Sequence, residues 1–348
     1  MSMSKVLPLA TPAITSYPEH ANLLSIIQNN DDAINWVYNQ FILLYVSEKL
    51  KHGIYFFPHT NYNYCPYVEF EKMSKDWVIK KWGTLQKYIC ECIDMGYYIT
   101  MQLNQFYISK SARYQNQRWT HPTLIYGYNL ETDEYNIADF YNNGKYTLTV
   151  ENMDCIDSAF QDSLDIARPD LPEFAFYRKM YQWSDDIILL KPFNSYRHVF
   201  KKELLLNQLS DYLNSENVFQ KYNTGEYNCY INEKQVFGIS VYNEAIKHFQ
   251  ELSGAPYIVN ILYIPLDHKK LMLSRVEFLI KKKYILNSQE IYDSFLGISK
   301  MIESLMNLGF KYNVTMQKKY IEEIISGITT IIDKESIAIE KLIRKLVE

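Results

Sequence analysis

The chain has 348 residues, of which 47% are hydrophobic and 22% are charged, and its formal net charge is -4. This length suits one large domain or two ordinary ones, and the composition excludes a chain that is disordered throughout. The small negative charge gives no basic field that would favour nucleic acid, so we expect no nucleic-acid partner.

Aromatic residues are abundant, with 31 tyrosines and 17 phenylalanines. Asn, Ile and Lys are frequent as well, so we interpret the aromatic content first as the coding bias of an AT-rich genome. A surface that stacks on sugars or bases is the alternative interpretation.

Cysteine usage and hydropathy bear on the compartment. The five cysteines are odd in number and widely spread, and none forms a CxxC pair, so neither a zinc site nor a redox motif is indicated: Cys65, Cys90, Cys92, Cys155 and Cys229. Reduced thiols in a cytoplasmic protein are expected. Residues 1–15 contain no long apolar run, which argues against a signal peptide, and no stretch reaches the length of a membrane span. We expect no metal, no cofactor and no membrane association.

The first hundred residues carry helical patterns. Ser16-Tyr17-Pro18-Glu19 predicts a helix start with Ser16 as the cap and Pro18 early in the first turn. A second helix is expected to begin at Asp31 or Asp32, and its apolar spacing continues through Leu44 and Tyr45. A short strand and an aromatic loop are expected over residues 53–67, and one helix from Met73 to Met95, ended by Gly96.

The pattern then changes to strands. Strands are expected over Tyr97–Leu103, Thr123–Tyr128, Tyr135–Phe140 and Tyr146–Val150. A polar connection over residues 104–118 precedes the second strand, and Asn142-Asn143-Gly144 is a hairpin turn. A helix is expected over residues 151–164. Helices followed by an antiparallel meander indicate an α+β fold.

The second half of the chain has mostly helical patterns. Residues 168–172 are the best linker, because they contain two prolines. A strand pair is expected within residues 174–190, and helices over residues 196–213, 235–249, 265–284, 287–308 and 314–346. The sequence therefore predicts two domains, an α+β domain over residues 1–168 and a mostly helical domain over residues 169–348. The two long final helices would also suit a homodimer.

His121 and Asp139 are the clearest candidates for chemistry. His121 opens one predicted strand, and Pro122 pushes its backbone toward an extended conformation. Asp139 lies near the end of the next predicted strand, so the two side chains are expected to be roughly opposite each other. A carboxylate in that place fixes the imidazole tautomer and supports a general base. A strand-end histidine and a turn aspartate without chemistry are the alternative.

The segments around this pair resemble a known family. His-Pro-Thr-Leu-Ile-Tyr-Gly-Tyr-Asn at 121–129 and Glu-Tyr-Asn-Ile-Ala-Asp-Phe at 134–140 are similar to the histidine–aspartate half of C39-like, papain-fold proteins. The nearest group is the family of the N-terminal domain of butirosin biosynthesis protein H. The glycine-led strand at 96–108 fits the same pattern, and the resemblance extends over about residues 14–165.

This resemblance implies a papain-like fold and acyl-transfer chemistry. Relatives include cysteine peptidases and acyltransferases that pass an acyl group from a carrier-protein thioester to an amine. The mechanism needs a thiolate at the N-terminus of the first helix, activated by the histidine, with backbone N–H groups that bind the oxyanion. In this chain the helix start at residues 16–20 contains no cysteine.

Three explanations for the missing cysteine remain open. The site is inactive and the domain only binds partners; or Ser16 replaces the cysteine, or Glu19 or His20 acts in a different reaction; or Cys65 reaches the site from its loop. A partly buried loop thiol is the plainer interpretation of Cys65. A metal held by His20, His121 and Asp139 has no supporting spacing motif.

The candidate site residues follow from these patterns. The catalytic candidates are His121, Asp139, Ser16 and Cys65. Five neighbours are expected to bind substrate: Tyr17, Glu19, His20, Gln102 and Asn104. His59 is a further pocket-edge candidate, with a plain loop histidine as its alternative.

A basic segment stands outside this site. Residues 267–275 and Lys281-Lys282-Lys283 are expected to form a basic helical face. A solvated face is the default interpretation, and docking of an acidic carrier protein or partner helix is the alternative.

We therefore carry two functional hypotheses, a leading one and an alternative. The first is an acyltransferase-like protein of bacterial secondary-metabolite biosynthesis, of the peptide or antibiotic kind, which acts on a thioester- or amide-linked acyl group. Its substrates would be an acyl carrier protein, a small molecule or a peptide. The second is a catalytically silent protein on the same fold that holds a carrier protein or a partner enzyme.

Overall fold

The computed structural model describes residues 2–47, 53–57, 60–142, 144–166, 186–222, 234–251 and 260–348. The chain forms two compact units that interleave along the sequence. The first unit comprises residues 1–33 and 61–197, and the second comprises residues 34–60 and 198–348.

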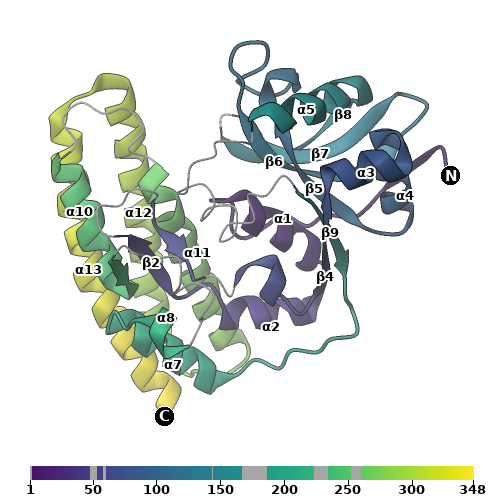
Figure 1. Cartoon of the computed structure of the whole chain (residues 1–348). Helices are drawn as coiled ribbons and strands as arrows, with labels where there is room; N and C mark the ends of the chain where they lie inside the picture. The colour runs from purple at the N-terminus through teal and green to yellow at the C-terminus, as the bar shows by residue number, and fades with distance from the viewer. Residues whose placement is uncertain are drawn as a thin grey trace. The chain divides into compact units, whose positions relative to one another are not determined.

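An antiparallel sheet of seven strands is the centre of the first unit (Figure 1). Six strands lie in the order β4-β9-β5-β6-β7-β8, and β1 adds to β6. Their bounds are β1 Ser4–Val6, β4 Val68–Ser74, β5 Tyr98–Asn104, β6 Thr120–Asn129, β7 Glu134–Asn142, β8 Lys145–Asn152 and β9 Asp186–Pro192. The expected meander is therefore present as β6, β7 and β8.

Strand β6 has two different neighbours on one of its sides. Residues 120–125 pair with β5, and residues 127–129 pair with β1. Gly127 lies where β1 arrives, and a β-carbon there would stand 2.8 Å from the Lys5 carbonyl oxygen and 2.7 Å from the Asn136 side chain. Only glycine therefore allows β1 to approach so closely.

Among the described helices, four pack on this sheet or its edge. The helix α1 (Pro18–Ile27) contacts β6 and β7, while α4 (Leu85–Asp94) and α5 (Met153–Ile166) contact β5. The helix α3 (Lys75–Trp82) contacts β4 and α4. The single helix expected from Met73 to Met95 is wrong, because Gly83 has a φ of 78° and separates α3 from α4.

The second unit is mostly helical (Figure 1). Its helices include α7 Lys202–Leu213, α8 Val218–Lys221, α10 Val241–Glu251, α11 Asn260–Lys281, α12 Gln289–Thr315 and α13 Lys318–Val347. Helix α12 packs along both α11 and α13. Isoleucines at helical spacing on α13, such as Ile321, Ile324 and Ile328, are buried, as their pattern predicts.

A sheet of three short antiparallel strands completes this unit: β10 Gln235–Phe237, β2 Leu44–Ser47 and β3 Tyr55–Phe56. The helical assignment of Leu44 and Tyr45 is therefore wrong. Helix α2 (Asp31–Asn39) ends earlier, and Phe41 has a φ of 57°, which no helix can continue through.

The structure confirms an α+β protein with an antiparallel sheet and a helical C-terminal region. The division into units differs from the expected boundary at residue 168. Strand β9 lies between β4 and β5 in the first unit, and residues 34–60 supply β2 and β3 to the second. The expected linker at 168–172 lies outside the described residues.

No helix within the described ranges is both long and apolar enough to cross a membrane.

Candidate functional site

His121 and Asp139 form a direct pair across neighbouring strands. His121 Nδ1 lies 2.9 Å from Asp139 Oδ2 and 2.8 Å from Oδ1. An ionised carboxylate only accepts hydrogen bonds, so Nδ1 carries the hydrogen and Nε2 keeps its lone pair when the ring is neutral. The His121 side chain is 27% exposed and that of Asp139 is 2% exposed. Nε2, the nitrogen that Asp139 does not hold, is therefore the one suited to act as a base.

Asp139 is held by further donors. The Thr123 hydroxyl donates to Oδ2 at 3.0 Å, the Gln105 amide donates to Oδ2 at 3.1 Å, and the Phe140 backbone N–H donates to Oδ1 at 2.7 Å. These hydrogen bonds satisfy the oxygen atoms of the buried carboxyl group. They also fix the direction from which it holds the imidazole.

Gln105 and Thr123 were not among the sequence candidates. One signal could have found Thr123: it lies two residues after His121 on the same strand, and alternation directs both side chains to one face. Gln105 had no comparable signal, because it lies in the short 3-10 helix η3 (Gln105–Tyr107) within the polar connection.

Glu19 stands in the first turn of α1. Burial raises the pKa of its carboxyl group to about 7, against the lowering effects of its own backbone N–H and of His121. Among the described residues Glu19 forms no ion pair, so it senses the charge of His121 without binding it directly. The carboxyl group is therefore poised to gain or lose a proton near neutral pH.

The pKa of His121 is raised above its usual value. Burial alone would lower it, but the charge of Asp139, the hydrogen bond to Asp139 and the charge of Glu19 together outweigh that effect and a smaller opposing one from Arg113. The ring of Phe140 packs edge-on against His121, with 5.9 Å between centroids. The charges of two carboxyl groups, those of Asp139 and Glu19, thus act on one imidazole.

Hydroxyl and amide groups lie near Glu19. Asn22, one turn further along α1, accepts a hydrogen bond from the Tyr146 hydroxyl at 2.8 Å. Tyr62, in the 3-10 helix η2 (Tyr62–Tyr64), hydrogen-bonds with Asn22 and Thr100 and feels the charge of Glu19, while burial raises its pKa well above the usual value. Tyr62 and Tyr146 are thus neutral hydrogen-bonding groups beside the site at ordinary pH.

The structure corrects the expected cap of α1. The N-cap residue is Tyr17, which makes no side-chain capping hydrogen bond, and Ser16 precedes it. Among the residues that the structure describes, no serine hydroxyl and no cysteine thiol hydrogen-bonds to His121. A serine nucleophile activated directly by this histidine therefore finds no support at Ser16.

Cys65 is a poor candidate nucleophile. The residue is 5% exposed, and burial raises the pKa of its thiol to about 12 against the lowering effect of the backbone N–H groups of Tyr67 and Val68. A thiolate is the reactive form of cysteine, so this environment suppresses reactivity. The expectation that Cys65 reaches the site is therefore replaced by that of a buried structural thiol.

His20 and Asn104, which were both expected to bind substrate, are buried. Burial lowers the pKa of His20 to about 3 despite its hydrogen bond with Asn61, and its ring packs edge-on against Tyr17. Asn104 is fully buried, and its amide donates to Asp162 and accepts from the backbone of Phe106 and Trp119.

Gln102 remains available for substrate. It lies on β5 opposite Pro122, next to the position that pairs with His121. Its side chain is partly exposed and has no hydrogen-bond partner in the described part of the chain. His59 and Cys229 lie outside the described residues.

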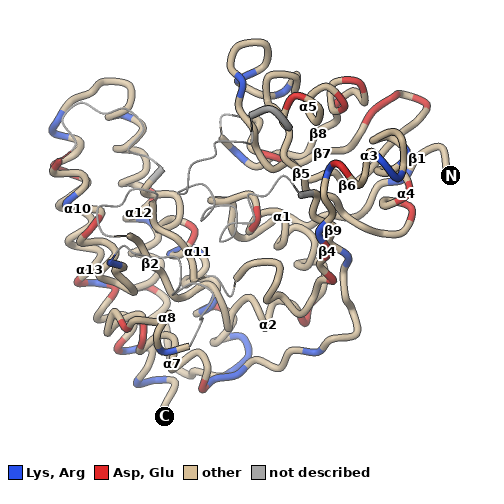
Figure 2. The backbone as a smooth tube through the Cα atoms, in the orientation of Figure 1, with Lys and Arg blue, Asp and Glu red and all other residues tan. Residues whose placement is uncertain are grey.

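The expected basic face on α11 is wrong for its central residues, because they are buried. Figure 2 colours Lys and Arg blue and Asp and Glu red along the backbone. Lys269 is buried and holds Glu335 of α13 at 2.5 and 2.6 Å, and it donates to the Tyr212 hydroxyl at 3.1 Å. His268 and Arg275 are also fully buried. The buried side chains of Lys269 and Arg275 stabilise the second unit, and they are not accessible to an acidic partner.

The chain was also compared with known proteins. No protein-family model matches it, and no curated protein sequence matches it.

Proposed function

We propose that the first unit is a papain-like domain of the C39-like kind that transfers a thioester- or amide-linked acyl group without a covalent intermediate. The observation that carries this proposal is the position of Glu19. A carboxyl group with a pKa of about 7, and no thiol, stands at the first turn of α1 beside the His121–Asp139 pair.

His121 and Glu19 would divide the proton transfers between them. His121 Nε2 takes the proton from an attacking amine or water as the new C–N or C–O bond forms, while Asp139 stabilises the imidazolium. Glu19 in its protonated form gives a proton to the leaving sulfur or nitrogen as the old bond breaks. Proton exchange between the imidazolium and the Glu19 carboxylate then restores both groups.

The developing oxyanion would find donors nearby. The first-turn N–H groups of a helix lack partners within the helix and carry its positive dipole end, so the start of α1 favours negative charge. The natural substrate in this proposal belongs to bacterial secondary-metabolite biosynthesis, with a carrier protein, small molecule or peptide as the acyl donor.

The test uses the full chain, an S-acyl-N-acetylcysteamine thioester and a primary amine. Glu19→Gln and His121→Ala are expected to lower kcat/KM by at least about 100-fold, as general acids and bases contribute about 10²–10⁴. Ser16→Ala and Cys65→Ala are the matched controls, and both should retain activity. Rapid quenching and mass spectrometry should detect no acylated protein.

Two outcomes would contradict the proposal. One is an acyl-enzyme on any residue, which would restore a covalent mechanism. The other is loss of activity in Cys65→Ala with normal folding, which would make the buried thiol the nucleophile.

A silent binding protein is the second candidate. What favours it is that no hydroxyl or thiol nucleophile contacts His121 in the described residues. In that case the wild-type protein binds the thioester or a carrier protein without turnover, and His121→Ala leaves the dissociation constant unchanged. Turnover that depends on both Glu19 and His121 would exclude it.

A further inference from the structure

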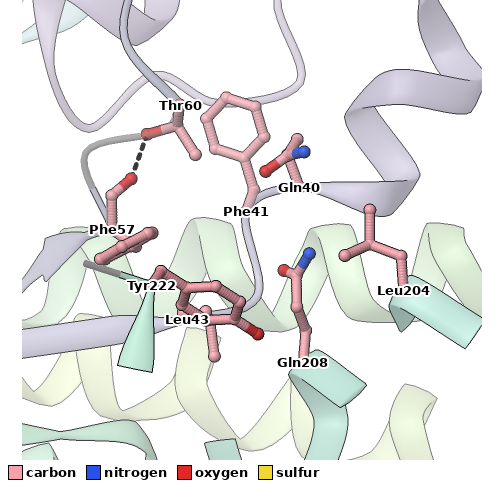
Figure 3. A pocket seen from close by; sticks show the side chains of 8 residues that line it. All are labelled: Gln40, Phe41, Leu43, Phe57, Thr60, Leu204, Gln208 and Tyr222. Atoms are coloured by element: carbon pink, nitrogen blue, oxygen red, sulfur yellow. Dashed lines mark hydrogen bonds between the residues drawn. The ribbon is translucent and has the colours of Figure 1, made fainter. Parts of the chain in front are cut away.

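The second unit contains a cavity of about 150 Å³ (Figure 3). Aromatic rings of Phe41, Phe57 and Tyr222 line it together with the amides of Gln40 and Gln208 and the aliphatic side chain of Leu204. None of the lining side chains that the structure describes is charged. The cavity therefore combines flat apolar walls with a few neutral polar groups, as small-molecule sites do.

The backbone that presents Gln40 and Phe41 is strained. Phe41 has a φ of 57°, a conformation that costs a bulky residue free energy and that persists only where surrounding contacts impose it. Strain of this kind concentrates at functional sites. The side chains of Phe41 and of Gln40, the residue before it, both line the cavity.

Four side-chain hydrogen bonds impose this conformation. Arg275 donates to the carbonyl oxygens of Tyr38 at 2.8 Å and Gln40 at 2.7 Å. The Gln208 amide donates to the carbonyl of Asn39 at 2.7 Å, and His268 Nε2 lies 3.0 Å from that of Ile42. A run of four carbonyl groups, at residues 38, 39, 40 and 42, is thus held by buried side chains.

Arg275, which holds two of these carbonyl groups, is itself in an unfavourable environment. Its side chain is fully buried and, within the described residues, no carboxylate accompanies it. An unpaired buried charge is strongly unfavourable, so its retention needs a compensating role. Holding the turn that shapes the cavity is the role that its hydrogen bonds indicate.

The lining polar groups that make no hydrogen bond within the described residues indicate which chemical groups a ligand would carry. The Gln40 side-chain amide has no hydrogen-bond partner among the described residues, and Gln208 uses its NH₂ on Asn39 while its Oε1 stays open. The Tyr222 hydroxyl already donates a hydrogen bond to the Asp211 carboxylate at 2.7 Å. Figure 3 shows the Gln208 amide rising from α7 into the space that Gln40 and Phe41 border.

We propose that this cavity binds a small, neutral, planar ring that carries an N–H beside a C=O, as a lactam does. The ring N–H donates to an amide oxygen of Gln208 or Gln40, and the ring C=O accepts from the Gln40 NH₂ group. The flat ring packs against Phe41, Phe57 and Tyr222. A cavity of roughly 150 Å³ accommodates a ring the size of benzene. This site is separate from the His121 site and does not depend on its chemistry.

The test uses 2-pyridone as the probe and the full-length protein, with NMR titration and calorimetry as readouts. Saturable binding is expected. N-methyl-2-pyridone lacks the N–H and should bind about tenfold more weakly, the equivalent of one hydrogen bond. Gln40→Leu keeps the size of the side chain and should weaken 2-pyridone by about tenfold while leaving benzene binding unchanged.

A pair of variants on α7 tests the location. Leu204→Phe fills the cavity and should abolish binding, whereas Leu206→Phe, on the same helix but outside the lining, should not. Absence of saturable binding to the folded wild-type protein would overturn the proposal, and so would 2-pyridone binding that survives Leu204→Phe. Equal affinity for the N-methyl probe would overturn the hydrogen-bonding scheme.

Discussion

At the residue scale, the Glu19 carboxyl group links folding to pH. Its folded pKa of about 7 exceeds the usual value of 4.5, so between those pH values the folded state holds more protons than the unfolded state. The free energy of unfolding therefore falls as pH rises through that window. We expect Glu19→Gln to raise Tm relative to wild type by roughly 2–4 °C at pH 8 and to make little difference at pH 4.5.

Thermal unfolding across that pH range measures the effect. Glu131→Gln, an exposed change in the turn after β6, is the control and should give a flat difference. A Glu19→Gln advantage that stays constant with pH would show that burial does not hold the proton on this carboxyl group.

The imidazole of His121 offers a second measurement at this scale. Burial lowers the pKa of His121, and the effects of Asp139 and Glu19 together outweigh that lowering. Asp139→Asn should therefore bring the pKa below its usual value. Glu19→Gln should lower it less, because its contribution is the smaller one. NMR titration of the ring Hε1 signal reports both values. A pKa that Asp139→Asn leaves unchanged would remove Asp139 as the orienting group.

The sequence located the chemistry of the site only in part. His121 and Asp139 were predictable because a residue that opens one strand of a hairpin meets one that closes the next. The place of Glu19 relative to them depends on how α1 packs on β6 and β7, which no local pattern encodes. The burial of Cys65, which decides against it as a nucleophile, is likewise a property of tertiary packing.

At the scale of elements, Gly127 sets how closely β1 approaches β6. A methyl group there would press on the backbone of β1, at Lys5 and Val6, and on Asn136. We expect Gly127→Ala to destabilise the protein by about 1–3 kcal/mol, the usual cost of overpacking. Gly297→Ala is the matched control, since it lies in α12 with open space around it. That change should stabilise by about 0.5–1 kcal/mol in denaturant unfolding.

The sequence predicts the type of an element well where the apolar periodicity is long. The prediction is wrong where a single residue with a positive φ ends a helix. The apolar spacing of α13 identified a buried helix face. By contrast, the apolar run through Leu44 and Tyr45 fits a helix as well as a strand, and the left-handed turn at Phe41 decides between them. That turn depends on donors from α7 and α11, more than 160 residues away in sequence.

At the scale of the whole molecule, the first unit needs residues beyond the linker that the sequence suggested. A fragment of residues 1–168 lacks β9, which pairs with β4 along seven residues and also with β5. Those strands would expose unpaired backbone groups. We expect this fragment to unfold without a cooperative transition in urea, followed by circular dichroism. A sharp transition in the fragment would contradict this expectation, and the full chain is the control.

The interleaving of the two units also orders events during synthesis. Strand β2 leaves the ribosome early, but its partner β10 begins at residue 235, so β2 waits for about 190 further residues, or roughly 10–40 s at usual rates of translation. Until then one edge of an apolar strand is open to other chains. We therefore expect slower translation after residue 60 to increase the loss of the nascent protein to aggregation.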